Sequence, residues 1–272
     1  MNKKMMLALA LFLSLTLCCS AAFAAITVGK KDMAINRSLD KNVTNVLVLM
    51  QDNGLTDTMM IASVNNRTGR SVMTRVDCGM TVNLKEAGDV KLAEVYEMGA
   101  EKSRGFLVAR TLNQMLDLNI STYIALDLTS LPAIVETVGT LNMIFDEEEA
   151  KAMGTWADIN ELSGDAVLSY VRLKLESDSP ARSRGYDALM QLLYQGLHSG
   201  NVMDMMGLGK KLLASMDTNL NPMAAVTMVS AVQGGSDRRE LLLPAQEHIV
   251  TADPLMADAE AMRALLHANL YE

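Results

Sequence analysis

The pattern that decides the fold lies in residues 44–77, which read TNVLVLMQDNGLTDTMMIASVNNRTGRSVMTRVD. The run 44–50 is a continuous apolar stretch, typical of a central strand that is buried on both faces. Two further apolar runs, 58–65 and 71–77, are joined by residues 65–70 (NNRTGR), which have the composition of a turn. This stretch therefore predicts three strands, of which the last two form a hairpin.

Helical and extended patterns alternate through the rest of the chain. Apolar side chains at helical spacing predict a helix over 101–117, and Ser130 with Pro132 opens another that runs to about Val138. The other expected elements are strands at 122–128, 141–145 and 240–243 and helices at 163–171, 185–198, 203–216, 222–233 and 253–270. Residues 147–161 are acidic and are expected to lie in solvent. Interleaved strands and helices predict a single α/β domain in helix–sheet–helix layers.

The composition excludes several classes of protein. The 272 residues include 24 Lys+Arg and 32 Asp+Glu, a formal net charge of −8, and half of the residues are hydrophobic. A chain of this size and composition buries a sizeable core and is neither disordered nor a disulfide-stapled miniprotein. An acidic protein lacks the basic face that nucleic-acid binding usually needs, so we expect no nucleic-acid partner.

The first 24 residues have the form of a secretory signal peptide. Lys3 and Lys4 precede the apolar run 5–21, and residues 22–24 (AFA) form a small-x-small cleavage signal. The alternative is an uncleaved membrane anchor, which needs about 20 apolar residues. We therefore expect the mature protein to be extracytoplasmic. Cys78 would then be its only cysteine and could form no internal disulfide.

Two carboxylates lie beside the first strands. Asp52 follows the first strand and Asp57 precedes the second, five residues away across a tight turn. Converging carboxylates at such a turn can bind a hard divalent cation such as Mg²⁺. Aspartate is also a common turn residue, so ordinary capping of the turn is the alternative.

A cluster of cations lies within residues 172–184 of this acidic chain. Its members are Arg172, Lys174, Arg182 and Arg184, against Glu176 and Asp178. Cations of this kind bind phosphate oxygens, and together with a metal they suit a pyrophosphate. The alternative is a solvated loop of mixed charge. The sequence contains no Walker-type phosphate loop, Gly-x-Ser-x-Gly motif or His-Glu-x-x-His motif.

Five segments resemble, in order, the LytR-CpsA-Psr family of envelope proteins. VLVLMQD (46–52) is similar to the family's first strand and its metal-site Asp. Residues 55–82 resemble, without a gap, the family stretch RSDTMMLVSINPKTKKVTLLSIPRDTYV. KLAEVYEMGA (91–100) resembles KINHAYAYGG, and residues 118–143 are similar to a segment with Gly-Gly after its helix. LSGDAVLSYVRLK (162–174) resembles LDGEQALAYVRFR, so the resemblance covers nearly all of the chain after residue 24.

The resemblance implies a mixed central sheet sandwiched between helical layers, enclosing an apolar tunnel for a polyprenyl tail. It also implies transfer of a glycopolymer from a polyprenyl-pyrophosphate carrier to peptidoglycan or another envelope acceptor, outside the membrane of a bacterium. The expected organisation is a signal peptide (1–24), an N-terminal extension (25–42) and a LytR-CpsA-Psr-like domain with a C-terminal helical segment (43–272). Such a protein would be secreted or bound to the cell wall, and would meet the membrane through its lipid ligand rather than through a transmembrane helix.

Site residues carry over from the family position by position. Asp52 and Asp57 match the carboxylates that hold Mg²⁺ in the family. Arg172 matches a pyrophosphate-binding arginine, and Lys174 stands where the family usually has a second arginine. The resemblance implies a catalytic and pyrophosphate-binding role for both. Lysine keeps the charge but loses the bidentate fork of arginine. The next family arginine corresponds to Arg182 or Arg184.

This chain departs from the family pattern in ways that leave the expected active site with fewer arginines and a shorter loop. Leu55 and Cys78 stand where the family has arginine, and the loop between Asp52 and Asp57 is shorter than usual. Arg75 is near but lies three positions earlier, within the expected strand. Three hypotheses therefore remain open. The first is a phosphotransferase, the second is a catalytically degenerate module that only binds the polyprenyl phosphate, and the third is an adaptor of cell-wall assembly.

Overall fold

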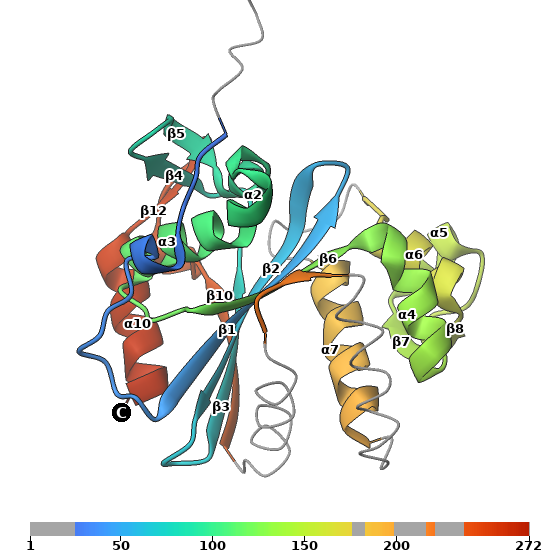
Figure 1. Ribbon diagram of the computed structural model, residues 1–272. Helices are drawn as coiled ribbons and strands as arrows, with labels where there is room; N and C mark the ends of the chain where they lie inside the picture. The colour runs from blue at the N-terminus through green and yellow to red at the C-terminus, as the bar shows by residue number, and fades with distance from the viewer. Residues whose placement is uncertain (1–24, 176–182, 199–215, 221–236, 272) are drawn as a thin grey trace, which may run out of the picture.

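A mixed β-sheet forms the centre of the computed structural model, which describes residues 25–175, 183–198, 216–220 and 237–271 (Figure 1). The strand order is β10-β3-β2-β1-β6-β9. β10 runs parallel to β3 and β6 runs parallel to β1, whereas the other neighbours are antiparallel. These strands are β1 (Val43–Asp52), β2 (Leu55–Asn65), β3 (Arg70–Val76), β6 (Thr122–Asp127), β9 (Asp217–Thr218) and β10 (Asp237–Leu243). The expectation of a mixed sheet is therefore confirmed.

Two tight turns fold β1, β2 and β3 into an antiparallel meander. Asp52 pairs with Leu55 across a two-residue turn, in which Asn53 and Gly54 have φ values of 50° and 81°. Asn-Gly suits this turn because both central residues need a positive φ. The second turn, over residues 66–69, joins β2 to β3 and confirms the expected hairpin.

Helices cover both faces of the sheet (Figure 1). Along β2, Met59 and Ile61 belong to one apolar core and Met60 and Ala62 to the other, because successive side chains point to opposite faces. The first core packs against α2 (Val95–Met98), α3 (Arg104–Leu116) and α10 (Ala259–Tyr271), and the second against α4 (Leu131–Val138), α6 (Gly164–Val171) and α7 (Arg184–His198). The predicted helix–sheet–helix layering is therefore confirmed.

Smaller elements surround this framework. Three two-stranded antiparallel sheets are β4 (Thr81–Leu84) with β5 (Gly88–Lys91), β7 (Leu141–Phe145) with β8 (Asp158–Leu162), and β11 (Ile249–Ala252) with β12 (Leu255–Ala257). The 3₁₀ helices are η1 (Lys30–Asp32), η2 (Leu92–Glu94), η3 (Glu101–Ser103), η4 (Leu128–Ser130) and η5 (Gln246–His248). The strand predicted at 141–145 is present as β7, but it pairs with β8 outside the central sheet.

Residues 147–161 are exposed at most positions, as expected, but Glu149, Ala150 and Asn160 are buried and part of the stretch is helical. Glu147–Met153 form helix α5, which begins with a capping box between Asp146 and Glu149. Acidic residues suit the first turn of a helix because they face its positive dipole end. The charge run therefore marks a helix start, and one of its carboxylates, that of Glu149, is buried.

The C-terminal helix is shorter than predicted. It begins at Ala259 rather than near 253, because residues 249–257 form the β11–β12 hairpin. The carboxylate of Asp258 accepts the backbone N–H groups of Glu260 and Ala261, which fixes the start of the helix.

Residues 25–42 pack against the first core. Ile26, Val28 and Met33 are buried there. Ile26 also exchanges backbone hydrogen bonds of 2.8 Å with Met98 and Ala100. This segment is therefore fixed to the domain that follows it.

Some expectations fall outside the described residues. They are the signal peptide at 1–24 and the helices at 203–216 and 222–233. Of residues 203–216, only Met216 is described. No described helix combines the length and the apolarity that crossing a bilayer requires.

Candidate functional site

Asp57 lies in a β-bulge near the tip of the β1–β2 hairpin. The register shifts by one residue between Met50 and Gln51, so that Asp57 is the residue of β2 without a partner on β1. A bulge redirects the side chain that it carries and is common beside functional sites. Asp52 ends β1, and both carboxylates therefore belong to the same end of the hairpin.

Two cations that follow α6 reach these carboxylates. Arg172 Nη2 lies 2.6 Å from Asp52 Oδ1 and its Nε lies 3.2 Å from Oδ2, so the guanidinium binds the carboxylate with both arms. Lys174 Nζ lies 3.2 Å from Asp57 Oδ1. The hydrogen bonds to Asp52 raise the pKa of Arg172 above its ordinary value. Each carboxylate of this four-residue cluster therefore has a cationic partner.

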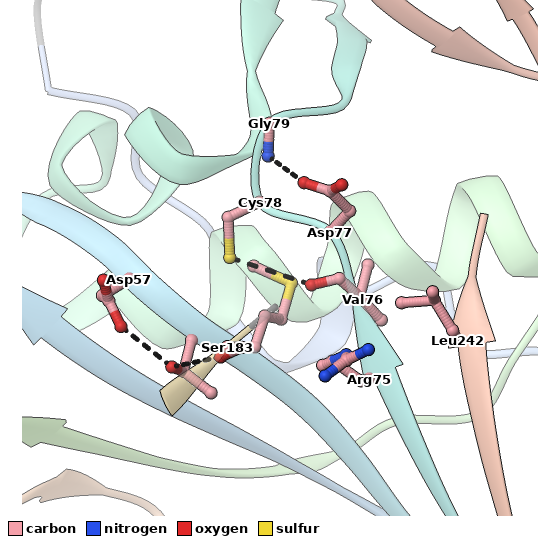
Figure 2. A pocket seen from close by; sticks show the side chains of 10 residues that line it. Asp57, Arg75, Val76, Asp77, Cys78, Gly79, Ser183 and Leu242 are labelled. Atoms are coloured by element: carbon pink, nitrogen blue, oxygen red, sulfur yellow. Dashed lines mark hydrogen bonds between the residues drawn. The ribbon is translucent and has the colours of Figure 1, made fainter. Parts of the chain in front are cut away.

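A cavity of about 210 Å³ lies between β2, β3, β10 and the start of α7 (Figure 2). Its polar lining consists of the side chains of Asp57, Thr58, Arg75, Asp77 and Ser183. Met59, Val76, Cys78 and Leu242 supply most of the rest. The cavity thus combines charged and hydroxyl groups with an apolar wall.

A chain of hydrogen bonds fixes the orientation of Asp57. Ser183 Oγ accepts the backbone N–H of Tyr186 at 3.2 Å, as an N-cap of α7 does. The hydroxyls of Ser183 and Thr58 lie 3.2 Å apart, and Thr58 Oγ1 donates to Asp57 Oδ2 at 3.0 Å. Because Thr58 uses its one proton on the carboxylate, Ser183 is the donor between the two hydroxyls. The start of α7 is thereby tied to Asp57.

Arg184 points to a different part of the molecule. Its Nε lies 2.8 Å from Glu149 Oε1, and its Nη1 donates to the carbonyl of Leu173 at 3.2 Å. The two charged side chains are only 4% and 1% exposed. Arg184 therefore joins α7 to α5 and to the segment after α6, and it is not among the residues that line the cavity.

Arg75 lines the cavity from β3, and its guanidinium carbon lies over the ring of Tyr186, 5.3 Å from the ring centroid. Burial of Tyr186 and the nearby charge of Glu240 raise the pKa of the tyrosine hydroxyl. Tyr186 is therefore a neutral, buried surface against which the cation rests.

Cys78 follows β3 and lines the same cavity. Its Sγ lies 3.8 Å from the carbonyl oxygen of Val76. Burial raises the pKa of the thiol, and the negative charges of Asp57 and Asp77 raise it further. The thiolate is the reactive form of cysteine, so Cys78 is a neutral wall residue rather than a nucleophile.

Comparison with known families identifies the chain. The LytR_cpsA_psr family matches it over residues 12–265. The chain belongs to this family. A curated relative, Biofilm regulatory protein A of Streptococcus mutans, is 22% identical over 186 residues, which is 61% of this chain and 44% of that protein. The chain thus spans less than half the length of this LytR-CpsA-Psr relative.

Solved structures share the LytR-CpsA-Psr fold. TagT of B. subtilis superposes with a TM-score of 0.71 at 14% identity, covering 90% of this chain and 99% of TagT. A structure of TagT with bound octaprenyl pyrophosphate gives a TM-score of 0.65 at 15% identity, with the same coverage of both chains. At this level of identity the likeness establishes the fold.

The site residues predicted from the family pattern are found in different places. Asp52, Asp57, Arg172 and Lys174 come together in one cluster, and of these Asp57 lines the cavity. Arg182 lies outside the described residues, and Arg184 is buried against Glu149. Sequence reasoning noted Arg75 without assigning it to the site, and it missed three other polar lining residues, which are Thr58, Asp77 and Ser183. Only Arg75 had a signal, namely a cation within an otherwise apolar strand.

Asp52 and Asp57 are the residues that would hold the Mg²⁺ ion that the family resemblance implies. Mg²⁺ usually binds through one or two carboxylates, substrate phosphates and several waters. Asp52 and Asp57 supply two such carboxylates. No cluster of three or more His, Cys, Asp or Glu side chains able to hold a metal occurs in the described part of the chain. A metal at this site would therefore depend on the ligand for part of its coordination.

Proposed function

We propose that this LytR-CpsA-Psr protein binds a glycopolymer linked to polyprenyl pyrophosphate and transfers it to an envelope acceptor such as peptidoglycan. The observation that carries the proposal is the pair of ion pairs, Asp52 with Arg172 and Asp57 with Lys174, beside the cavity that Asp57 lines. A solved structure of the same fold holds octaprenyl pyrophosphate, a ligand whose charges suit this cluster.

Arg172 and Lys174 are the residues that we assign to pyrophosphate binding. Their side chains are 38% and 78% exposed, so that both can turn toward a ligand. Exposed ion pairs contribute little to stability, because water screens the charges and ordering of long side chains opposes them. Exchange of a carboxylate for a pyrophosphate therefore costs little. Lys174 would bind the phosphate oxygens as a compact point charge, whereas Arg172 would bind them through two N–H groups at once.

Asp52 and Asp57 become available to a metal once the cations have turned to the phosphates. The two carboxylates would then hold Mg²⁺, whose charge would neutralise the phosphates and promote attack at phosphorus. The hydrogen bond from Thr58 keeps Asp57 oriented whether or not Lys174 remains bound to it. The same side chains thus serve a resting state and a ligand-bound state.

In the transfer step, a hydroxyl group of the acceptor attacks the sugar-proximal phosphate. A bond forms between the acceptor oxygen and phosphorus, and the bond to the bridging oxygen breaks, so that polyprenyl phosphate leaves and the proton of the hydroxyl group is released to water. Arg172 and Lys174 stabilise the negative charge that gathers on the phosphate oxygens in the transition state.

The proposal places the protein outside the cytoplasmic membrane, where such acceptors occur. Residues 1–24 would direct export. The protein would associate with the membrane through the polyprenyl chain of its ligand.

Binding without transfer is the second candidate function, and the neutral Cys78 favours it. The resemblance places an arginine at Cys78 and another at Leu55, which is exposed near the tip of the β1–β2 hairpin. The substitution Cys78→Arg separates the two candidates. A protein that only binds would gain transfer activity from it, whereas a transferase turns over without it.

Release of polyprenyl phosphate from a polyprenyl-pyrophosphate-linked saccharide tests the proposal. We expect Mg²⁺-dependent release by the wild type in the presence of peptidoglycan fragments, and release slower by about 100-fold or more in Asp57→Ala. Asp40→Ala is the matched control, because Asp40 also pairs with an arginine but on a distant loop. Equal rates for Asp57→Ala and the wild type would contradict the role of Asp57.

A further inference from the structure

Arg75 is a cation of the cavity that the proposed mechanism does not use. On the sheet it lies opposite Met60 of β2 and Leu242 of β10, and its side chain lines the cavity. Met60 belongs to the core beneath α7, which places Arg75 on that face of the sheet. In the view of Figure 2, Ser183 lies between Asp57 and Arg75. The cavity therefore carries the carboxylate of Asp57 at one side and the guanidinium of Arg75 at the other, and the carboxylate of Asp77, which accepts the backbone N–H of Gly79, also lines it.

The hydrogen-bond donors of Arg75 have no protein acceptor among the described residues. The contact with the Tyr186 ring, at 5.3 Å, is the interaction that the described structure gives this guanidinium. A ring below the guanidinium carbon supports the cation through its face, while the five N–H donors lie in the plane of the group. Arg75 is thus held in position with its donors available.

The two cations assigned above differ from Arg75 in this respect. Arg172 and Lys174 are each bound to a carboxylate, and each must leave it before binding a phosphate. Arg75 can bind a phosphate without breaking an ion pair.

We propose that Arg75 is a phosphate-binding residue of this cavity and supplies, from β3, the guanidinium that is absent at Cys78. The inference rests on the proposed function and adds a residue to it, since the family stretch has serine at the position of Arg75. Both side chains line one cavity, so a cation from either position can reach the same ligand. An arginine at position 75 in place of one at position 78 keeps the charge of the site.

Binding of octaprenyl pyrophosphate, measured beside octaprenol, tests this inference. Octaprenol has the same tail without the charges. We expect Arg75→Ala to weaken binding of the pyrophosphate by about 10- to 100-fold, because hydrogen bonds to a charged group are lost. Binding of octaprenol should not change. Arg75→Gln, which keeps most of the side-chain length beside Tyr186, should weaken binding similarly and guards against a folding defect in the alanine variant.

Rescue separates a ligand contact from a merely structural role. In the Arg75→Ala background, Cys78→Arg should restore most of the affinity for octaprenyl pyrophosphate, since it returns a guanidinium to the cavity from the other position. Arg67→Ala removes an equal charge from the distant β2–β3 turn and should bind both lipids as the wild type does.

Each outcome of the experiment is decisive. If the wild type binds octaprenyl pyrophosphate and Arg75→Gln binds it equally well, the inference on Arg75 is wrong and the proposed function stands. If the wild type binds the pyrophosphate no better than octaprenol, the inference and the proposed function are both wrong. If Arg75→Ala loses affinity but Cys78→Arg does not restore it, the inference that Arg75 replaces an arginine at position 78 is wrong.

Discussion

Gly185 is the residue at which the start of α7 touches the bulge of β2. A Cβ atom on Gly185 would lie 2.1 Å from Thr58 Oγ1 and 2.9 Å from Asp57 Oδ2, closer than such contacts can be. Glycine therefore allows the helix to approach the two residues that carry the hydrogen-bond chain to Ser183. The position of Asp57 depends on this approach as well as on the bulge.

Gly185→Ala should destabilise the protein by about 1–3 kcal/mol, as overpacking usually does. Helix propensity alone would make the alanine variant more stable than the wild type, because it favours alanine over glycine. A loss of stability would therefore identify the collision as its cause. Urea unfolding of both proteins measures it.

A second substitution checks that Thr58 is the group in collision. Adding Thr58→Ala to Gly185→Ala removes the nearest atom and should recover part of the lost stability, whereas Thr58→Ser keeps the hydroxyl and should not. A Gly185→Ala protein as stable as the wild type would contradict this account of the contact.

Individual site residues were predictable to different degrees. Asp52 and Asp57 flank the first turn, and Arg172 and Lys174 belong to a short family motif, so local sequence and resemblance identified them. Their pairing was not predictable, because it depends on the register of β1 and β2 and on the one-residue bulge at Asp57.

At the scale of elements, the predicted strands and helices agree with the structure wherever one apolar period dominates. The β1–β3 meander and helices α3, α6 and α7 were all predicted within a few residues. The outer two-stranded sheets were missed or given no partner, since strands of three to five residues carry little periodicity and their pairing is set by the fold. The same applies to α5, whose acidic first turn looks like a solvated loop when its capping box is not considered.

Glu149 and Arg184 form the ion pair that joins α5 to α7. We expect Glu149→Gln to lower the free energy of unfolding by about 3 kcal/mol, because it leaves the buried charge of Arg184 without its carboxylate. Glu147→Gln, on the exposed face of the same helix, is the matched control and should change stability little. Thermal unfolding of the wild type and the two variants measures these effects. Equal stability of Glu149→Gln and Glu147→Gln would contradict the role of the buried ion pair.

At the scale of the whole molecule, the sheet lies between two helical layers (Figure 1), and the cavity is lined both by Arg75 on the α7 face and by Met59 and Val76 of the first core. Residues from β2, β3, β10 and the start of α7 line it, although 185 positions of the sequence separate Asp57 from Leu242. The α/β class was predictable from the alternation of elements. The mixed sheet came from the family resemblance, because local patterns do not reveal that β10 pairs with β3.

The central claim is that this cavity and its charged cluster bind a prenyl pyrophosphate, and mass spectrometry of lipid extracts tests it most directly. The purified wild type, Arg172→Ala and the control Arg67→Ala would each be incubated with octaprenyl pyrophosphate and Mg²⁺, washed and extracted. We predict the lipid in the wild type and in Arg67→Ala, and its depletion in Arg172→Ala. Absence of the lipid from the wild type, or equal amounts in all three proteins, would contradict the claim.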